Sequence, residues 1–281
     1  MRNPANSPFL PWVTTFYCLC DDFLLSASQH DHPSCQMSSA EVMTVALVAV
    51  LYFGGNFAHA RRLLHEPKWM PVMLSKSRFS RRLYRVEHQF LILFHLLAEV
   101  WKAKNEEQVY LIDTFPIPIC DNYRIKRNRI YGQEKYRGYK SSKRCYFYGL
   151  KLHMLTTKSG MPVEFLLSPG SVADVSGLYG FDFDLPEGAI IIGDKAYNMY
   201  WLEDIMAAAG LTLLPVRKKN SKRPLKPWER GLQLRCRQAV ETAGSLIQRK
   251  LPKSIHAVNA EGFELKVKLF VLGLSIGQML K

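Results

Sequence analysis

Long apolar runs are absent from this chain. None reaches the 18 or more residues that a membrane-spanning helix needs, and the most apolar stretches, 43–53 and 269–280, are short enough to be core helices. A secretory signal is missing too, because the apolar segment 9–20 contains a proline and runs into Asp21 and Asp22. These absences exclude an integral membrane protein, and we expect a cytoplasmic one.

Cysteine is scarce, with six residues scattered through 281. A chain of this length builds a core without disulfides, so reduced thiols are expected. One region nevertheless gathers residue types that bind zinc. They are Cys18, Cys20, His30, His32 and Cys35. Their spacing matches no familiar zinc pattern, so the role of this cluster and of segment 1–38 stays open.

Acidic residues are few. The sequence has 24 Asp and Glu against 38 Lys and Arg, which gives a formal net charge of +14 and a pI near 9.5. The excess is concentrated in segments 61–85, 122–151 and 217–250, whereas segment 1–40 has one basic residue, Arg2. Basic patches of this kind indicate a polyanionic partner, and a nucleic acid backbone fits them.

The apolar pattern predicts an irregular segment 1–38, a helical module 39–104 and an α/β domain 109–281. The module's predicted helices cover 39–53, 56–65 and 77–102, and a closing helix, 264–280, is predicted to pack on the α/β core. The third helix of the module begins with a basic face. Its arginines include Arg78, Arg81 and Arg82. This arrangement is typical of a helix-turn-helix DNA-binding module, although a support domain with solvated arginines explains the pattern equally well.

Two short apolar strands of the α/β domain each end in an aspartate. Residues 109–112 run into Asp113, with a proline-punctuated turn at 115–118, and residues 189–193 run into Asp194. A lone aspartate after a strand is more often a turn or cap residue. Two such strands side by side would bring both carboxylates to one metal-sized site, which is the interpretation we favour.

Segment 122–144 is a basic loop in which tyrosines are interleaved with cations and little apolar content is available to fold against. Its first cations are Arg124, Lys126, Arg127 and Arg129. Aromatic rings stack on unpaired bases while cations hold phosphates. We therefore predict a DNA clamp that orders on binding, with a solvated insertion as the alternative.

A β-hairpin is predicted over 145–167, with Lys151 and His153 on one face. We predict that both surround the phosphate of a bound nucleic acid rather than binding the metal, together with Lys195, which follows Asp194, and Arg237. For His153 alone, a satisfied structural role is the simpler interpretation. Asp174 is predicted to cap the segment after the hairpin.

The helix predicted over 229–250 contributes a third carboxylate, Glu241. A surface glutamate paired with Arg237, one turn earlier, is the ordinary interpretation. Glu241 is, however, one of only two acids in the basic span 217–250. With Asp113 and Asp194 it completes a set of three carboxylates, the ligands that hard divalent cations need.

The motifs YGLKLH (148–153), GDKAY (193–197) and RQAVE (237–241), taken with Asp113, resemble the DDE transposases of bacterial insertion sequences. The resemblance covers residue 109 to the C-terminus. It implies a ribonuclease-H-like mixed sheet flanked by helices, with a metal-binding triad of Asp113, Asp194 and Glu241. Arg237 matches a basic residue expected to contact DNA. Two positions depart from the pattern, because Leu234 replaces a common tyrosine and Gln248 a common lysine.

The resemblance further implies an insertion-sequence transposase that cleaves transposon ends and transfers the strand to target DNA, using two Mg²⁺ or Mn²⁺ ions. A homodimer on DNA, associated with the bacterial nucleoid, is expected. No phosphate-cradling glycine loop is present, so no nucleotide cofactor is expected. The alternatives are a metal-dependent nuclease without joining activity and a catalytically inactive DNA-binding relative.

Overall fold

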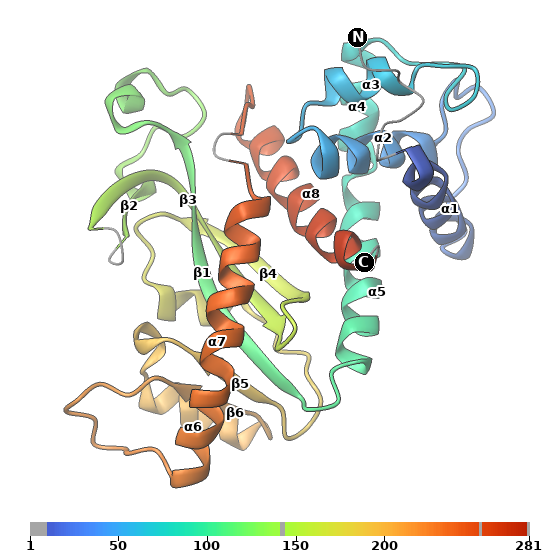
Figure 1. Ribbon diagram of the computed structural model, residues 1–281. Coiled ribbons are helices and arrows are strands. Elements are labelled where there is room, and N and C mark those ends of the chain that lie inside the picture. The colour runs from blue at the N-terminus through green and yellow to red at the C-terminus, as the bar shows by residue number, and fades with distance from the viewer. Residues whose placement is uncertain (1–9, 141–143, 253–254, 280–281) are drawn as a thin grey trace. The chain divides into compact units, whose positions relative to one another are not determined.

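The computed structural model describes residues 10–140, 144–252 and 255–279 (Figure 1). It does not describe the side chains of residues 10, 237–241, 243, 246, 248, 250 and 278. The chain forms two compact units, of which the first combines residues 1–94 with 261–281 and the second spans residues 95–260.

The first unit is helical. It contains α1 (Leu10–Ser26), α2 (Ser39–Tyr52), α3 (Phe57–Leu64), α4 (Lys76–Arg85), the start of α5 (Glu87–Ala103) and α8 (Ala260–Met279). Helix α2 is its centre, because every residue from Val42 to Val50 is buried. It begins at a capping box in which Ser38 and Glu41 bond each other's backbone amides.

Three features of this unit differ from the sequence-based expectation. Helix α1 occupies the segment predicted to be irregular, and the single helix predicted over 77–102 is two helices that meet at Val86. Helix α8 clusters with the first unit rather than with the α/β domain. The expected helices over 39–53 and 56–65 correspond to α2 and α3.

No single helix of the described chain is long and apolar enough to cross a membrane. Helices α2 and α3 meet that requirement of length and composition only as a pair, and the pair is bent by 118°.

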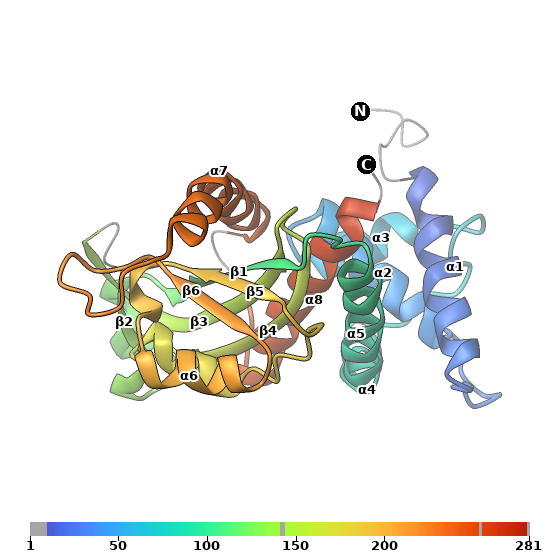
Figure 2. The same cartoon turned by 90° about the horizontal axis from the view of Figure 1, so that it is seen from below.

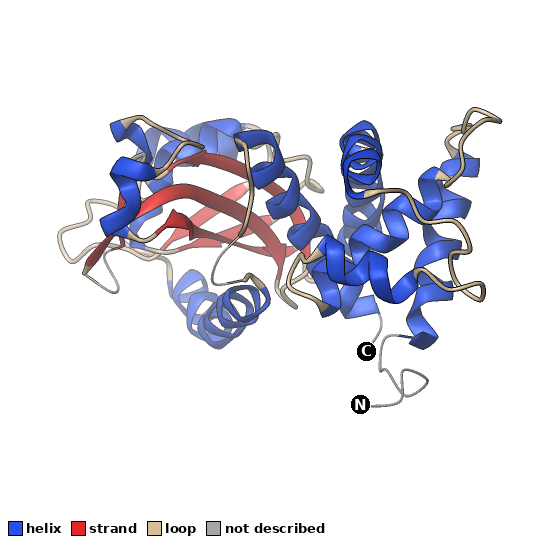
Figure 3. Ribbon diagram, turned by 90° about the horizontal axis from the view of Figure 1, so that it is seen from above, coloured by secondary structure: helices blue, strands red, loops and turns tan. Residues whose placement is uncertain are grey.

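The second unit is built on a six-stranded mixed sheet (Figure 3). Its strands are β1 (Val109–Cys120), β2 (Arg137–Lys140), β3 (Cys145–Thr157), β4 (Pro162–Pro169), β5 (Ile190–Gly193) and β6 (Thr212–Pro215). Strand β3 pairs antiparallel with β1, β2 and β4, whereas β1, β5 and β6 run parallel. Four strands paired antiparallel through β3, followed in sequence by two strands parallel to β1, are consistent with a ribonuclease-H-like fold, so the predicted fold class is confirmed.

Helices cover both faces of this sheet, with α7 (Pro227–Lys250) on one face and α6 (Tyr200–Ala208) on the other (Figure 2). Side chains of β1 alternate between them, as the pleat of a strand requires. Val109 and Leu111 pack with Leu232 and Cys236 of α7. Tyr110 and Ile112 belong to the cluster that contains α6. Asp113 is two residues after Leu111 and therefore faces α7.

Candidate active site

Asp113 and Asp194 lie on neighbouring parallel strands. The parallel register pairs Val109 with Ile190 and Leu111 with Ile192, and continuing it by two residues brings Asp113 opposite Asp194. Strand β5 ends at Gly193, so Asp194 follows a strand end as predicted. Asp113 does not, because β1 continues through the predicted proline turn to Cys120, paired with β3. Only Asp194 therefore follows a strand end, and Asp113 lies opposite it from within the longer strand β1.

The local backbone holds both carboxylates. The amide of Thr114 donates to Asp113 Oδ1 at 2.7 Å, and the amide of Ala196 donates to Asp194 Oδ1 at 2.7 Å. Asp194 is thus also the cap of a short 3₁₀ turn, η6 (Lys195–Tyr197). The cap interpretation and the site interpretation of this residue are compatible.

The surroundings of Asp113 and Asp194 disfavour the ionised form of both carboxyl groups. Burial, reinforced by the negative charges of Asp194 and Asp174, raises the pKa of Asp113 to about 6, although the Thr114 amide and Lys140 oppose the shift. Asp194 is exposed as a residue, but its carboxylate is partly enclosed by protein, and this desolvation raises its pKa too. Carboxylates that repel one another gain from a cation between them. The donors present fit Mg²⁺ or Mn²⁺.

The third proposed ligand comes from α7. A Cβ atom added at Gly244 would lie 3.5 Å from Asp113 Oδ2, so α7 passes directly over Asp113. Glu241 is three residues earlier on the same helix, but its side chain and that of Arg237 lie outside the described residues. Among the described side chains, no group of three His, Cys, Asp or Glu residues is placed to hold a metal ion. Two candidate ligands are therefore described, and the third is not.

His153 is not where we predicted it. Its ring is fully buried, with Nε2 2.7 Å from Ser168 Oγ and Nδ1 3.1 Å from Thr114 Oγ1. A Cβ atom at Gly177 would come within 2.2 Å of Nδ1, so the backbone there closes over the ring. Burial lowers the pKa of His153 to about 4. The buried ring has no surface for direct contact with a phosphate, and its contacts favour the structural interpretation of His153.

The amine of Lys151 is engaged in contacts within the protein. Its Nζ donates to the carbonyl oxygen of Val172 at 2.7 Å and to Asp174 Oδ1 at 2.8 Å. Asp174 begins η5 (Asp174–Gly180) without capping it through a side-chain hydrogen bond. Its charge raises the pKa of both Asp113 and Asp194. Sequence reasoning missed Asp174 as a site residue, because its partner Lys151 is on β3, 23 residues away in sequence.

Comparison with protein-family models matches residues 103–256 to the transposase DDE domain. The match covers more than half of the chain and most of the second unit. The chain belongs to this transposase family. No curated protein and no solved structure matches it.

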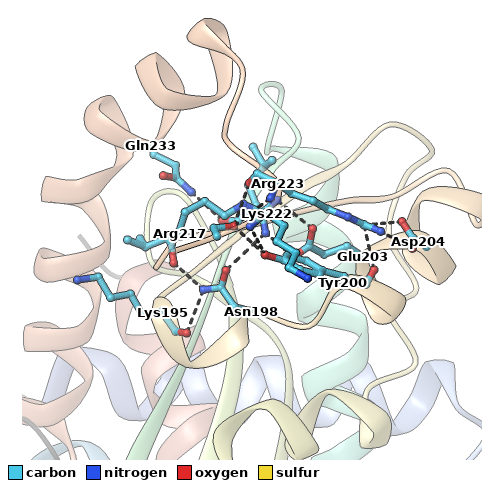
Figure 4. A network of polar contacts seen from close by, with 12 residues as sticks. Lys195, Asn198, Tyr200, Glu203, Asp204, Arg217, Lys222, Arg223 and Gln233 are labelled. Carbon is cyan, nitrogen blue, oxygen red and sulfur yellow. Dashed lines mark hydrogen bonds and ion pairs between the residues drawn. The ribbon is translucent and has the colours of Figure 1, made fainter. Parts of the chain in front are cut away.

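In this transposase domain, a polar network fixes the turn that follows Asp194 (Figure 4). The side-chain Nδ2 of Asn198 donates to the carbonyl oxygens of Lys195 at 3.0 Å and Val216 at 2.6 Å. It thereby joins the turn to the residue that follows β6. Lys195 itself is exposed beside Asp194, as a cation at the edge of the site should be.

The same network fastens the basic loop between β6 and α7. Arg217 contacts both carboxylate oxygens of Glu203 on α6, at 2.5 and 2.9 Å. Arg223 contacts both oxygens of Asp204, at 2.7 and 2.9 Å, and its guanidinium lies 4.8 Å from the centre of the Tyr200 ring. Both arginines tie this loop to α6.

The basic segment 122–144 of the domain is more structured than expected. It contains two 3₁₀ turns, η2 (Asn122–Arg127) and η3 (Glu134–Tyr136), and strand β2; residues 141–143 lie outside the described residues. Tyr131 is buried, with its ring 4.4 Å from that of Tyr136, and Tyr148 donates to the carbonyl of Tyr131 at 3.0 Å. The tyrosines supply the core that composition alone does not reveal. The expectation that this segment orders only on binding was wrong.

The predicted cations of that segment are at its surface. Arg124, Lys126, Arg127 and Arg129 are all exposed, and Arg124 lies over the ring of Tyr123. In the first unit, Arg78 and Arg81 are exposed too. Arg82 is different, because it pairs with Asp31 at 2.6 Å and its side chain is only 17% exposed. It is a structural residue there, not the free DNA contact we predicted.

Proposed function

We propose that this protein is an insertion-sequence transposase that cuts DNA at the ends of a mobile element and joins the freed 3′-hydroxyl to target DNA. The observation that carries the proposal is the pair of aspartates on adjacent parallel strands beneath α7, within a transposase DDE domain. A phosphodiester is the substrate that such a carboxylate site and the exposed cations around it fit best.

Asp113 and Asp194, with Glu241 on α7, would hold one or two Mg²⁺ or Mn²⁺ ions. When bound, divalent ions supply Lewis-acid stabilisation of the charge that develops on the phosphoryl oxygens. The carboxylates act as ligands and not as nucleophiles. Lys195 and Arg237 are proposed to orient the phosphate from the rim, while Lys151 contributes charge from its place on Asp174.

Thr114 and His153 position Asp113 from the opposite face of β1. The Thr114 hydroxyl lies between His153 Nδ1 and the Tyr197 hydroxyl, at 3.1 and 2.9 Å. This buried chain fixes Thr114, whose amide holds the Asp113 carboxylate. A carboxylate fixed in advance loses less conformational freedom when it binds a cation.

The test is nicking of a supercoiled plasmid with Mg²⁺ or Mn²⁺ present or chelated. Asp113→Asn, Asp194→Asn and Glu241→Gln should each lower the cleavage rate roughly a thousandfold or more, while DNA binding survives. Asp121→Asn is the matched control, because Asp121 is an exposed aspartate just past the end of β1. Near wild-type cleavage by a folded Asp113→Asn protein would refute the site.

Joining separates the transposase from its alternatives. The plasmid should carry the DNA that flanks the gene, and the products should be sequenced across new junctions. Cut ends without junctions would indicate a nuclease, and metal-independent binding without cuts would indicate a DNA-binding relative. We also propose that the protein acts as a homodimer on DNA. The mass of the protein–DNA complex tests this.

A further inference from the structure

Three large apolar side chains are exposed together on the face of the sheet that α6 covers. Tyr179 of η5 and Trp201 and Ile205 of α6 are 55%, 50% and 52% exposed. The rings of Tyr179 and Trp201 are stacked, with their centres 5.6 Å apart and 21° between their planes. Ile205 is four residues after Trp201 and shares its side of the helix. These three residues, here called the α6 patch, form the kind of surface that contacts another protein.

The charge around the α6 patch argues against DNA as its partner. Residues 160–210, which contain η5 and α6, have eight acidic residues and one basic residue, a net charge of −7 within a chain whose net charge is +14. Such a segment repels a phosphate backbone. Helix α6 also lies on the opposite face of the sheet from α7, which passes over Asp113 (Figure 2). The partner of the patch is therefore a protein.

Opposite charges lie at the two ends of α6. At its start, the Tyr200 hydroxyl accepts from the amide of Lys222 at 2.9 Å, and Arg223 donates to the carbonyl oxygen of Tyr200 at 3.2 Å (Figure 4). Just past its end, a Cβ atom added at Gly210 would lie 3.2 Å from the side chain of Glu187. The side chains of Lys222 and Glu187 are exposed, and neither forms an ion pair with a described residue.

This arrangement is self-complementary about a two-fold axis. Two copies of α6 packed antiparallel, with the axis beside Ile205, would bring Trp201 of each copy onto Ala208 of the other. Ala208 is exposed seven residues after Trp201, on the same side of the helix. The same operation would place Lys222 of each copy near Glu187 of the other. A large ring then meets a small side chain, and a cation meets a carboxylate, twice in one interface.

We propose that the α6 patch joins two copies of this chain in a symmetric dimer that forms without DNA. The inference rests on the proposed function for the number of copies, and it adds the surface that holds them together. Contact through α6 leaves α7 of both copies outside the interface, because the two helices cover opposite faces of the sheet. The dimer therefore needs neither DNA nor metal.

The experiment measures the mass of the nuclease-treated full chain by sedimentation over a concentration series, in chelator and without added DNA. Ile205→Glu should raise the dimer dissociation constant about a hundredfold or more, because the two new carboxylates meet at the axis. Leu234→Glu is the matched control, since Leu234 is 67% exposed on α7, and it should dimerise like wild type. A wild-type chain that stays monomeric at every concentration would overturn the proposal, and so would a control that dissociates as readily as Ile205→Glu.

Exchange of charges tests the register of the two helices. Glu187→Lys and Lys222→Glu should each weaken the dimer about tenfold or more, because each change creates two like-charge contacts. Combining both changes in one chain, or mixing the two single variants, should restore association. Single variants that dimerise like wild type, or a double variant that does not recover, would overturn the proposed arrangement. Every substituted side chain is exposed, so the far-ultraviolet circular dichroism spectrum should not change, and misfolding is recognised separately.

The outcome is separable from the proposed reaction. A protein that dimerises through α6 but produces neither cuts nor junctions with Mg²⁺ or Mn²⁺ retains the dimer surface and loses the transposase reaction. A protein that cuts and joins DNA but is monomeric in its absence retains the reaction and loses the surface.

Discussion

Arg82 differs from its neighbours on α4 because its guanidinium meets the carboxylate of Asp31 across 51 residues of sequence. Burial alone would raise the pKa of Asp31. Hydrogen bonds from Ser39 and Arg82 nevertheless hold this pKa below its usual range. The helical pattern reveals the basic face of α4 but not this long-range partner. Arg82 therefore looked like a DNA contact in the sequence, and the same is true of any cation whose counterion is distant in sequence.

This ion pair predicts a pH effect. A carboxyl whose pKa is lowered by folding stabilises the protein above its unfolded pKa, about 3.9, and loses that contribution as pH falls through the folded value. Asp31→Asn should lower the free energy of unfolding at pH 7 by about 0.5–1 kcal/mol, after solvent screening. The difference from wild type should shrink toward pH 3.

Denaturant unfolding at pH 7, 5, 4 and 3 measures this effect. Asp22→Asn is the control, because Asp22 is exposed on α1 and has no hydrogen bond or ion pair with a described residue. A difference between Asp31→Asn and wild type that stays constant over this range would show that the pair contributes through packing and not through charge.

At the scale of elements, the hydrophobic periodicity and the turn residues at segment boundaries predicted most strands of the sheet. Strands β3, β4 and β5 lie within a few residues of the expected segments. Strand β1 is longer than predicted because Pro116 and Pro118, usually strand breakers, are tolerated in it. Its pairing with β5 ends at Leu111, so beyond that point one side of β1 is an edge that needs no N–H donor.

Helix boundaries were harder to predict where packing decides them. Phe79, Leu83, Val86 and Phe90 are all buried, so the apolar stripe continues across the break between α4 and α5. No glycine or proline marks that break, and periodicity alone therefore predicts one helix. In the site, the two strand aspartates were predictable from local pattern. Asp174 and Asn198 were not, because their roles depend on contacts with β3 and β6.

The loop between β6 and α7 depends on one buried ion pair. The side chains of Arg217 and Glu203 are 14% and 9% exposed. Arg217→Met leaves Glu203 without its partner and should cost about 3–5 kcal/mol of unfolding free energy, whereas Arg217→Met/Glu203→Gln should cost clearly less. Arg223→Met is the matched control, since its pair with Asp204 is exposed, and it should change stability little.

Denaturant unfolding of the three variants tests this, with Mn²⁺ affinity as a second readout. Because Asn198 links this region to the turn after Asp194, Arg217→Met should also weaken Mn²⁺ binding, which the Arg223 control should not. If the single and double variants lose equal stability, the pair is held by packing rather than by its charges.

At the scale of the whole molecule, the sequence indicated two parts but not their membership. The chain leaves the helical unit within α5, builds the transposase domain, and returns to the first unit with α8. The segment from residue 261 onward is apolar like any core helix. Its own sequence does not indicate which of the two hydrophobic cores it joins. Buried contacts answer that question, for example Phe270, which would meet a Cβ atom at Gly55 at 3.1 Å.

The composition alone gives the net charge of +14, and this charge predicts that DNA binding weakens as salt concentration rises. The tyrosine core of segment 122–140 keeps the exposed cations of residues 124–129 in place without DNA, so neutralising them should not unfold the segment. Replacing Arg124, Lys126, Arg127 and Arg129 with Gln should flatten the log–log salt slope by up to about 3.6, at about 0.9 per phosphate. Mn²⁺ affinity and thermal stability should stay at wild-type values.

Combining this quadruple variant with Arg78→Gln/Arg81→Gln, which removes the two exposed arginines predicted to contact DNA from α4, makes the measurement sharper. If both units bind the same duplex, the two reductions in slope should add, because counterion release is counted phosphate by phosphate. If only one unit touches DNA, the combined variant should match the more affected parent. An unchanged slope in the quadruple variant alone would identify these four cations as a solvated surface, leaving the α4 arginines and the carboxylate site as the remaining predicted contacts with DNA.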